Sequence, residues 1–202
     1  MATHTFVNLD LPEANTLADL TSVEFDLLSA KDFALRLKGM FSANPPDYSL
    51  VDPLSTAIII RYSRTFASGV RKLPLEEGLL QLTKNQKEKH QYFRDLRDKH
   101  IAHSVNCFEE STPRANYCKE RVKAEGITSI SCEHNRVVGL SSENLDAVVE
   151  LADTWLEFVG MKTKEESTRL LPIVREMPLD DVLSVGMKPT DSGRGPVDKR
   201  RK

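Results

Sequence analysis

The chain has 202 residues, of which 40% are hydrophobic and 29% are charged, a composition typical of a globular protein with one domain. The formal net charge of −2 argues against binding to long duplexes, because proteins that hold nucleic acid through its phosphates usually have a basic excess. The longest apolar run, residues 57–60, is far shorter than the roughly 18 residues of a membrane span, so we expect no membrane insertion.

The cysteines and the N-terminus indicate a cytoplasmic protein. Cys107, Cys118 and Cys132 are odd in number, and their spacing matches no structural zinc pattern. Unpaired thiols are typical of a reducing compartment. The first nine residues lack the basic start and apolar stretch of a signal peptide. We therefore predict a cytoplasmic location, no metal and no other cofactor.

Two helices are predicted in the first third of the chain. Apolar residues recur at helical spacing between residues 17 and 41, as one long helix or two short ones. Asp52 and Pro53 predict the start of the next helix, as a capping carboxylate and a proline at the first helical position. Its wide apolar stripe consists of Leu54, Ile58, Ile59, Ile60, Tyr62 and Phe66. A stripe of this width indicates a central helix contacted from several sides.

The next predicted helix is very polar and has few apolar anchors. Leu73, Pro74 and Gly78 predict a short connection before it, and Thr83 can cap its start. The anchors of this helix are Phe93, Leu96, His100 and Ile101. The helix therefore presents most of its surface to solvent.

A β-hairpin and two further helices are predicted in the second half. Segments 127–132 and 137–140 flank the polar turn 133–136, and residues 117–124 favour a helical turn or a short strand. A helix opens at residues 141–144 with Gly160 as its stop, and another runs over 164–175, kinked or ended at Pro172. Residues 188–202 have the composition of a disordered basic tail. The predicted fold is mainly α, with a small β-hairpin inserted in a helical core.

The most informative segment covers residues 93–104, at the end of the polar helix. Arg94 can pair with Asp98, and Asp95 with Lys99, along a solvated helix face. Histidines near a helix C-terminus also interact favourably with the helix dipole. The spacing of these charged residues and histidines alone therefore does not predict a catalytic site.

Residues 96–104, Leu-Arg-Asp-Lys-His-Ile-Ala-His-Ser, resemble the signature of the HEPN superfamily, especially its abortive-infection and toxin-type branches. That signature is an arginine, a polar residue directly after it, and a histidine five to seven positions on; Arg97, Asp98 and His103 match it. The resemblance implies one HEPN-like helical-bundle domain over residues 1–187. It also implies a homodimeric, metal-independent endoribonuclease that cuts single-stranded RNA, acts as a toxin or antiphage effector, and is restrained by a cognate antitoxin protein.

The residue types suit that chemistry. His103 can act as base or acid near neutral pH, and Arg97 can donate two hydrogen bonds to phosphate oxygens, while the resemblance implies that Asp98 orients one of them. Six residues of an ideal α-helix leave Arg97 and His103 roughly 120° apart, whereas His100 is the closer neighbour. His100 is thus a second catalytic candidate, or a half-buried packing residue.

Arg61, Arg64 and Lys99 are candidate phosphate-binding residues, and charges on a solvated helix face are the alternative reading. Two other functions stay open. A non-catalytic HEPN module would bind nucleotide, RNA or a protein partner. An unrelated helical protein would carry the Arg-His spacing by accident.

Overall fold

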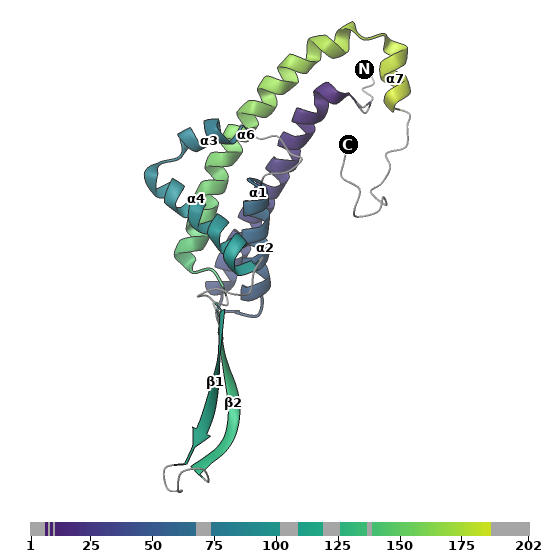
Figure 1. Cartoon of the computed structure of the whole chain (residues 1–202). Coiled ribbons are helices and arrows are strands. Elements are labelled where there is room, and N and C mark those ends of the chain that lie inside the picture. Colours follow the sequence, from purple (N-terminus) through teal and green to yellow (C-terminus); the bar gives the residue numbers. More distant parts are fainter. Residues whose placement is uncertain are drawn as a thin grey trace.

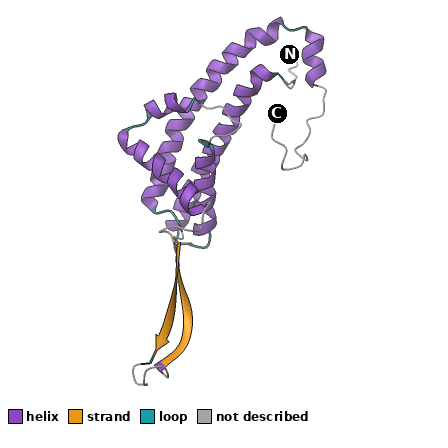
Figure 2. Ribbon diagram, viewed as in Figure 1, coloured by secondary structure: helices purple, strands orange, loops and turns teal. Residues whose placement is uncertain are grey.

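The computed structural model describes residues 7, 9, 11–67, 74–101, 109–118, 126–136 and 139–186. Helices dominate, and two antiparallel strands form a small sheet (Figures 1 and 2), which confirms the predicted class of mainly α with a β-hairpin. The elements are η1 (Pro12–Ala14), α1 (Asn15–Phe41), α2 (Val51–Arg64), α3 (Leu75–Gln81), α4 (Lys84–Leu96), η2 (Arg97–Ile101), β1 (Glu109–Tyr117), β2 (Ile127–Arg136), α6 (Ser142–Glu176) and α7 (Leu179–Gly186). The predicted tail, 188–202, lies outside the described residues.

The two longest helices, α1 and α6, run antiparallel and frame the bundle (Figure 1). Lys31 Nζ donates to Asp153 Oδ1 at 2.5 Å, and Lys38 pairs with Asp146 further along the same two helices. Exposed pairs of this kind set the register but contribute little stability. Residues 15–41 form one continuous helix, which decides between the one-helix and two-helix predictions.

The predicted end of α6 at Gly160 is wrong. Ser141 caps the helix as predicted, because its Oγ accepts from the Asn144 amide at 3.3 Å. From there the helix continues through Gly160 and Pro172 to Glu176. Phe158, Val159 and Leu170 are buried around these two weak points. Packing of this face overrides the low helix propensity of glycine and proline.

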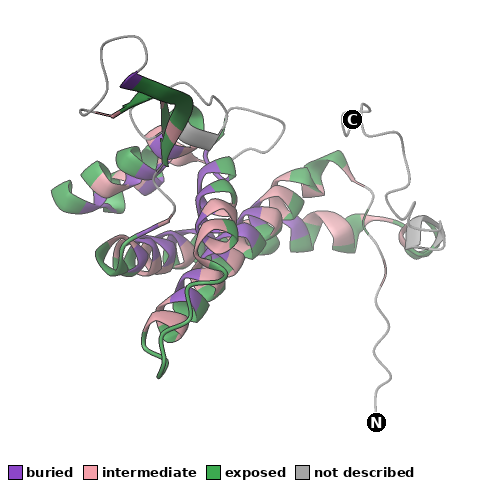
Figure 3. Ribbon diagram, turned by 90° about the horizontal axis from the view of Figure 1, so that it is seen from below, coloured by how far each residue is buried: buried purple, intermediate pink, exposed green. Residues whose placement is uncertain are grey.

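α2 lies in the core between α1 and α4. It begins at Val51 without a side-chain cap, so Asp52 belongs to the first turn and is not the predicted cap. Ile58, Ile59 and Tyr62 are buried, whereas Ile60 is exposed, so the apolar stripe is narrower than its composition suggests. Buried residues line the inward faces of the helices (Figure 3). α2 contacts both α1 and α4, as expected for a central helix.

An aromatic cluster fills the space between α2, α4 and α6. The ring centroids of Phe66 and Trp155 are 4.7 Å apart, and those of Phe66 and His90 are 4.6 Å apart. Tyr62 Oη lies 2.8 Å from His90 Nδ1, so one hydrogen bond joins two buried polar groups. Trp155 of α6 is almost fully buried and lies in the core cluster.

The connection predicted around Gly78 is a short helix, α3. Gly78 is buried where α3 meets α6, and a Cβ atom added there would lie 2.1 Å from Cζ3 and 2.7 Å from Cη2 of Trp155. Glycine is therefore needed at this position because α3 approaches the Trp155 ring of α6 closely, and not because the chain turns here. The two helices can meet here only without a side chain.

Replacing Gly78 by alanine is expected to lower the free energy of unfolding by about 1–3 kcal/mol, because the Trp155 ring is enclosed by the core and must shift. Gly160→Ala is the matched control. Gly160 is exposed within α6, with no atom within 4 Å of an added Cβ, so alanine should stabilise by about 0.5–1 kcal/mol. Urea unfolding followed by circular dichroism measures both. Equal effects of the two substitutions would contradict this account of Gly78.

The hairpin is longer than predicted, and its strands differ from those expected. β2 is continuous across 133–136, the segment predicted to be the turn, and its partner is β1. The ribbon stands away from the bundle (Figure 2) and buries neither face, so polar residues can occupy strand positions without cost. The polar composition of residues 133–136 was therefore a poor guide to where the strand ends.

Candidate functional site

The segment that carries the arginine–histidine motif lies where α4 passes into a π-helical turn. α4 begins with a capping box: Thr83 Oγ1 accepts from the Gln86 amide at 3.2 Å, and Gln86 Oε1 accepts from the Thr83 amide at 2.9 Å. Phe93 and Leu96 are buried and anchor its end. η2 follows directly. Single π turns are rare, and they are frequent at functional sites.

The π turn changes the geometry expected around Arg97. Bonds of a π-helix join residues five apart instead of four, so the α-helical angle predicted between positions 97 and 103 does not apply to residues 97–101. The side chain of His100 and the whole of His103 lie outside the described part of the chain. Their catalytic roles therefore stay predictions.

A polar hollow of about 210 Å³ lies beside this turn. Its lining residues come from the end of α2 and from α4 with η2: Ser63, Ala67, Arg94, Arg97 and Asp98. The Ser63 hydroxyl donates to the Phe93 carbonyl oxygen at 3.1 Å, which fixes the end of α2 against α4. The hollow thus has a rigid floor and charged walls.

Arg97 and Asp98, two of the predicted catalytic residues, are brought together in this hollow. Arg97 Nη1 donates to Asp98 Oδ1 at 2.6 Å, and both side chains are about half exposed. Asp98 pairs with Arg97 and not with Arg94, the partner expected from helical spacing, whereas Lys99 does pair with Asp95, at 3.6 Å. The carboxylate can therefore orient the guanidinium while leaving its other N–H groups available.

Arg94 is a member of the site that the sequence prediction missed. Its side chain is half buried, and it forms no ion pair with any of the described residues. Burial, and then the positive charge of Arg94, lowers the pKa of His90 to about 4, so this neighbour is neutral at pH 7. The available signal was the spacing of three between Arg94 and Arg97, which places both on one helix face.

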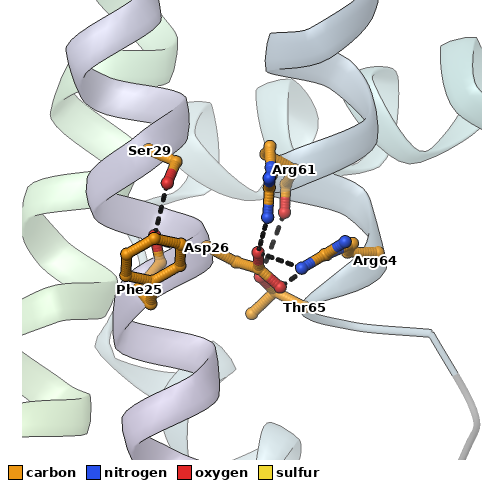
Figure 4. Close-up of polar contacts among 6 residues, drawn as sticks. All are labelled: Phe25, Asp26, Ser29, Arg61, Arg64 and Thr65. Atoms are coloured by element: carbon orange, nitrogen blue, oxygen red, sulfur yellow. Dashed lines mark hydrogen bonds and ion pairs between the residues drawn. The ribbon is translucent and has the colours of Figure 1, made fainter. Parts of the chain in front are cut away.

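Arg61 and Arg64 lie on the opposite side of α2, facing α1 (Figure 4). Both donate to the fully buried Asp26: Arg61 Nη1 to Oδ1 at 2.8 Å, and Arg64 Nε to Oδ2 at 2.6 Å. Their side chains keep 33% and 41% exposure. Phosphate binding, predicted for both, would have to compete with this carboxylate.

The hollow is suited to a phosphate group. Arg94 and Arg97 supply two positive charges and Asp98 one negative charge, which leaves about one net positive charge at its walls. Guanidinium groups donate paired hydrogen bonds to phosphate oxygens and stay charged at any physiological pH. A local site of this kind is compatible with the slightly acidic chain as a whole.

Within the described ranges, no three histidine, cysteine, aspartate or glutamate side chains gather as metal ligands would. Nor does any helix there have an apolar stretch long enough to cross a membrane. Comparison of the chain with protein-family models, with curated proteins and with solved structures finds no match.

Proposed function

We propose that the protein is a metal-independent endoribonuclease of the HEPN type, which cuts single-stranded RNA as a homodimer. One observation carries the proposal: Arg97, held by Asp98, lies with a second arginine, Arg94, on the wall of a polar hollow that has room for a phosphate group. This pairing of a motif arginine with its adjacent polar residue supports the resemblance to HEPN proteins. Such an enzyme would act in the cytoplasm as a toxin or antiphage effector restrained by an antitoxin.

The proposed reaction needs two proton transfers and one charged phosphate. One His103 removes the proton of the RNA 2′-hydroxyl, and the 2′-oxygen attacks the adjacent phosphorus. The bond from phosphorus to the 5′-oxygen breaks, and His103 of the second copy protonates the departing oxygen. Arg94 and Arg97 stabilise the negative charge that builds on the phosphate oxygens. The products are a 2′,3′-cyclic phosphate and a 5′-hydroxyl.

Cleavage of single-stranded RNA in the presence of chelator tests the proposal. Arg97→Ala is expected to lose about 10²–10³-fold in rate, because it removes a donor to the charged transition state. Arg175→Ala is the matched control, since Arg175 is an exposed arginine near the end of α6, outside the hollow, and should leave the rate unchanged. If the protein is a toxin, Arg97→Ala should also abolish growth arrest on expression.

Separate His103→Ala and His100→Ala variants decide between the two candidate histidines. We expect loss of cleavage in the first and retention in the second. Fragments from the wild-type protein should end in 2′,3′-cyclic phosphate. Cleavage that persists in His103→Ala would refute the site assignment.

The second candidate is a non-catalytic module that binds nucleotide or RNA. It is favoured by the lining of the hollow, whose two arginines suit a phosphate group without any further catalytic side chain. This function predicts no cleavage and binding of a mononucleotide that weakens in Arg94→Ala. Titration calorimetry with the wild-type protein and this variant separates the two functions.

A further inference from the structure

The β1–β2 ribbon projects from the end of the bundle where α1 ends and α6 begins (Figure 1), and it is largely exposed (Figure 3). Its register pairs Ser111 with His134, Pro113 with Cys132, and Ala115 with Ile130. Successive side chains of a strand point to opposite faces, so this register defines which residues share a face. We call the ribbon the arm.

One face of the arm is polar. Asn116 Nδ2 donates to Ser129 Oγ at 2.8 Å, and Arg114 forms an ion pair with Glu133. These cross-strand contacts satisfy polar side chains in water. This face is therefore stable in contact with water and does not indicate a binding partner.

The other face of the arm is apolar towards its tip. Its residues are Pro113, Ala115, Tyr117, Ile127, Ile130 and Cys132. Ile130 is 72% exposed, Tyr117 56% and Ile127 51%. A two-stranded ribbon is at best marginally stable alone in water, and contiguous exposed apolar surface commonly marks an interaction site. The arm therefore has a face suited to packing on another surface.

The same chain carries a largely apolar surface on α1 that is somewhat shorter than the arm. Phe25, Leu28 and Leu35 lie on one side of α1 and are 64%, 48% and 47% exposed. This face continues into a hollow of about 700 Å³, which is lined by apolar residues such as Phe33, Met40 and Leu54 and also by the charged Asp32, Arg36 and Asp47. The stretch of α1 from residue 25 to residue 40 is about 22 Å long, and the nine-residue strand β1 is about 30 Å long.

We infer that two copies of the chain exchange arms, with the apolar face of each arm packed on the outer face of α1 of the other copy. The arm points away from its own bundle, so its own α1 does not receive it (Figure 1). A two-fold axis makes both contacts at once, because each copy offers one arm and one α1 face. The arm of each copy thus covers the α1 face of the other copy, and both apolar faces are buried.

The areas favour this reciprocal arrangement over a single contact. Because the α1 face is about 22 Å long, a ribbon about 10 Å wide covers roughly 220 Å² of it. One contact would bury roughly 440 Å² in total, within the size of crystal-packing contacts, whereas two bury roughly 900 Å², which is above that size. The exchange would give the homodimer on which the proposed function depends.

The mass of the full chain in solution tests the exchange. Wild type is expected to have the mass of two chains by light scattering, and Ile130→Glu the mass of one. Ser131→Glu is the matched control, because Ser131 lies next to Ile130 on the polar face, and it should stay dimeric. A monomeric wild type, or the same mass for both variants, would overturn the inference.

Cross-linking tests which surfaces meet, and it does not depend on weakening the dimer. Cys132 is exposed on the apolar face of the arm, and Ser29 is partly exposed on α1 beside the exposed Leu28. With Cys107 and Cys118 replaced by serine, a short bismaleimide should join Ser29→Cys to Cys132 of the second copy. Ser167→Cys, exposed on α6, is the control and should give no cross-linked dimer. Equal or absent cross-linking at both positions would overturn the inference.

These measurements need no RNA, so the outcomes can be told apart. A dimer that fails to cut RNA would contradict only the nuclease proposal. A wild-type monomer would overturn arm exchange whether or not it cuts RNA.

Discussion

Replacing Asp26 by asparagine is expected to lower the free energy of unfolding by about 2–3 kcal/mol. The Asp26 carboxylate is fully buried and accepts hydrogen bonds from Arg61 and from two nitrogens of Arg64 (Figure 4). Asparagine has nearly the same shape, but its NH₂ group would face guanidinium donors and its single oxygen cannot accept all three bonds. Removing one partner of a buried ion pair commonly costs 3–5 kcal/mol; here the arginines are partly exposed and can turn to water, which reduces the cost.

Asp32→Asn is the matched control for this prediction. Asp32 lies on the same helix and pairs with Arg36 at 2.7 Å, but both side chains are more than half exposed. Solvent screening limits such a pair to a few tenths of a kcal/mol. Denaturant unfolding of the two variants at pH 7 should therefore give clearly different midpoints. Similar midpoints would show that the Asp26 cluster does not lock α1 to α2.

Much of the fold follows from local signals in the sequence. The spacing of apolar residues placed α1, α2 and the first half of α6, and Thr83 and Ser141 correctly indicated where two helices start. Two of the failures, both at glycines, share a cause. Gly160 and Gly78 signal an end or a turn by propensity, but packing decided the outcome at both positions. Local rules cannot report which helix lies across from a glycine.

The candidate site was predicted only in part. The motif directed attention to Arg97 and Asp98, which the structure places together in one hollow. Arg94 was missed because helical spacing predicted that it would pair with Asp98 on the helix surface. Asp98 pairs with Arg97 instead, and side-chain pairing inside a π turn cannot be predicted from α-helical spacing. Asp26 was missed because its position on an otherwise apolar face of α1 gives no sign of the two arginines 35 and 38 residues away.

Acidification from pH 6.5 towards pH 4 is expected to destabilise the protein through His90. This histidine is buried, and burial, followed by the positive charge of Arg94, lowers its pKa to about 4. In the unfolded chain His90 would take up a proton near pH 6.5, while the folded protein stays unprotonated until about pH 4. The unfolded state thus binds more protons in this window, and the free energy of unfolding falls by about 1.4 kcal/mol per pH unit. The stabilisation is fully present above pH 6.5, and about 3 kcal/mol of it is lost by pH 4.

The variant His90→Asn isolates this effect, because its side-chain amide can still hydrogen-bond to the Tyr62 hydroxyl but does not titrate. It is expected to be less stable at pH 7, since a smaller side chain leaves a cavity, yet its stability should hardly change between pH 6.5 and 4.5. Carboxylates such as Glu143 and Glu166, whose pKa values are lowered by Lys89 and Arg169, act mainly below that window. His134→Asn, an exposed position on the arm, should keep the wild-type slope. If the free energy of unfolding of His90→Asn still falls between pH 6.5 and 4.5 as it does in the wild type, another group drives the loss of stability. His90 would then not be the group whose protonation destabilises the protein.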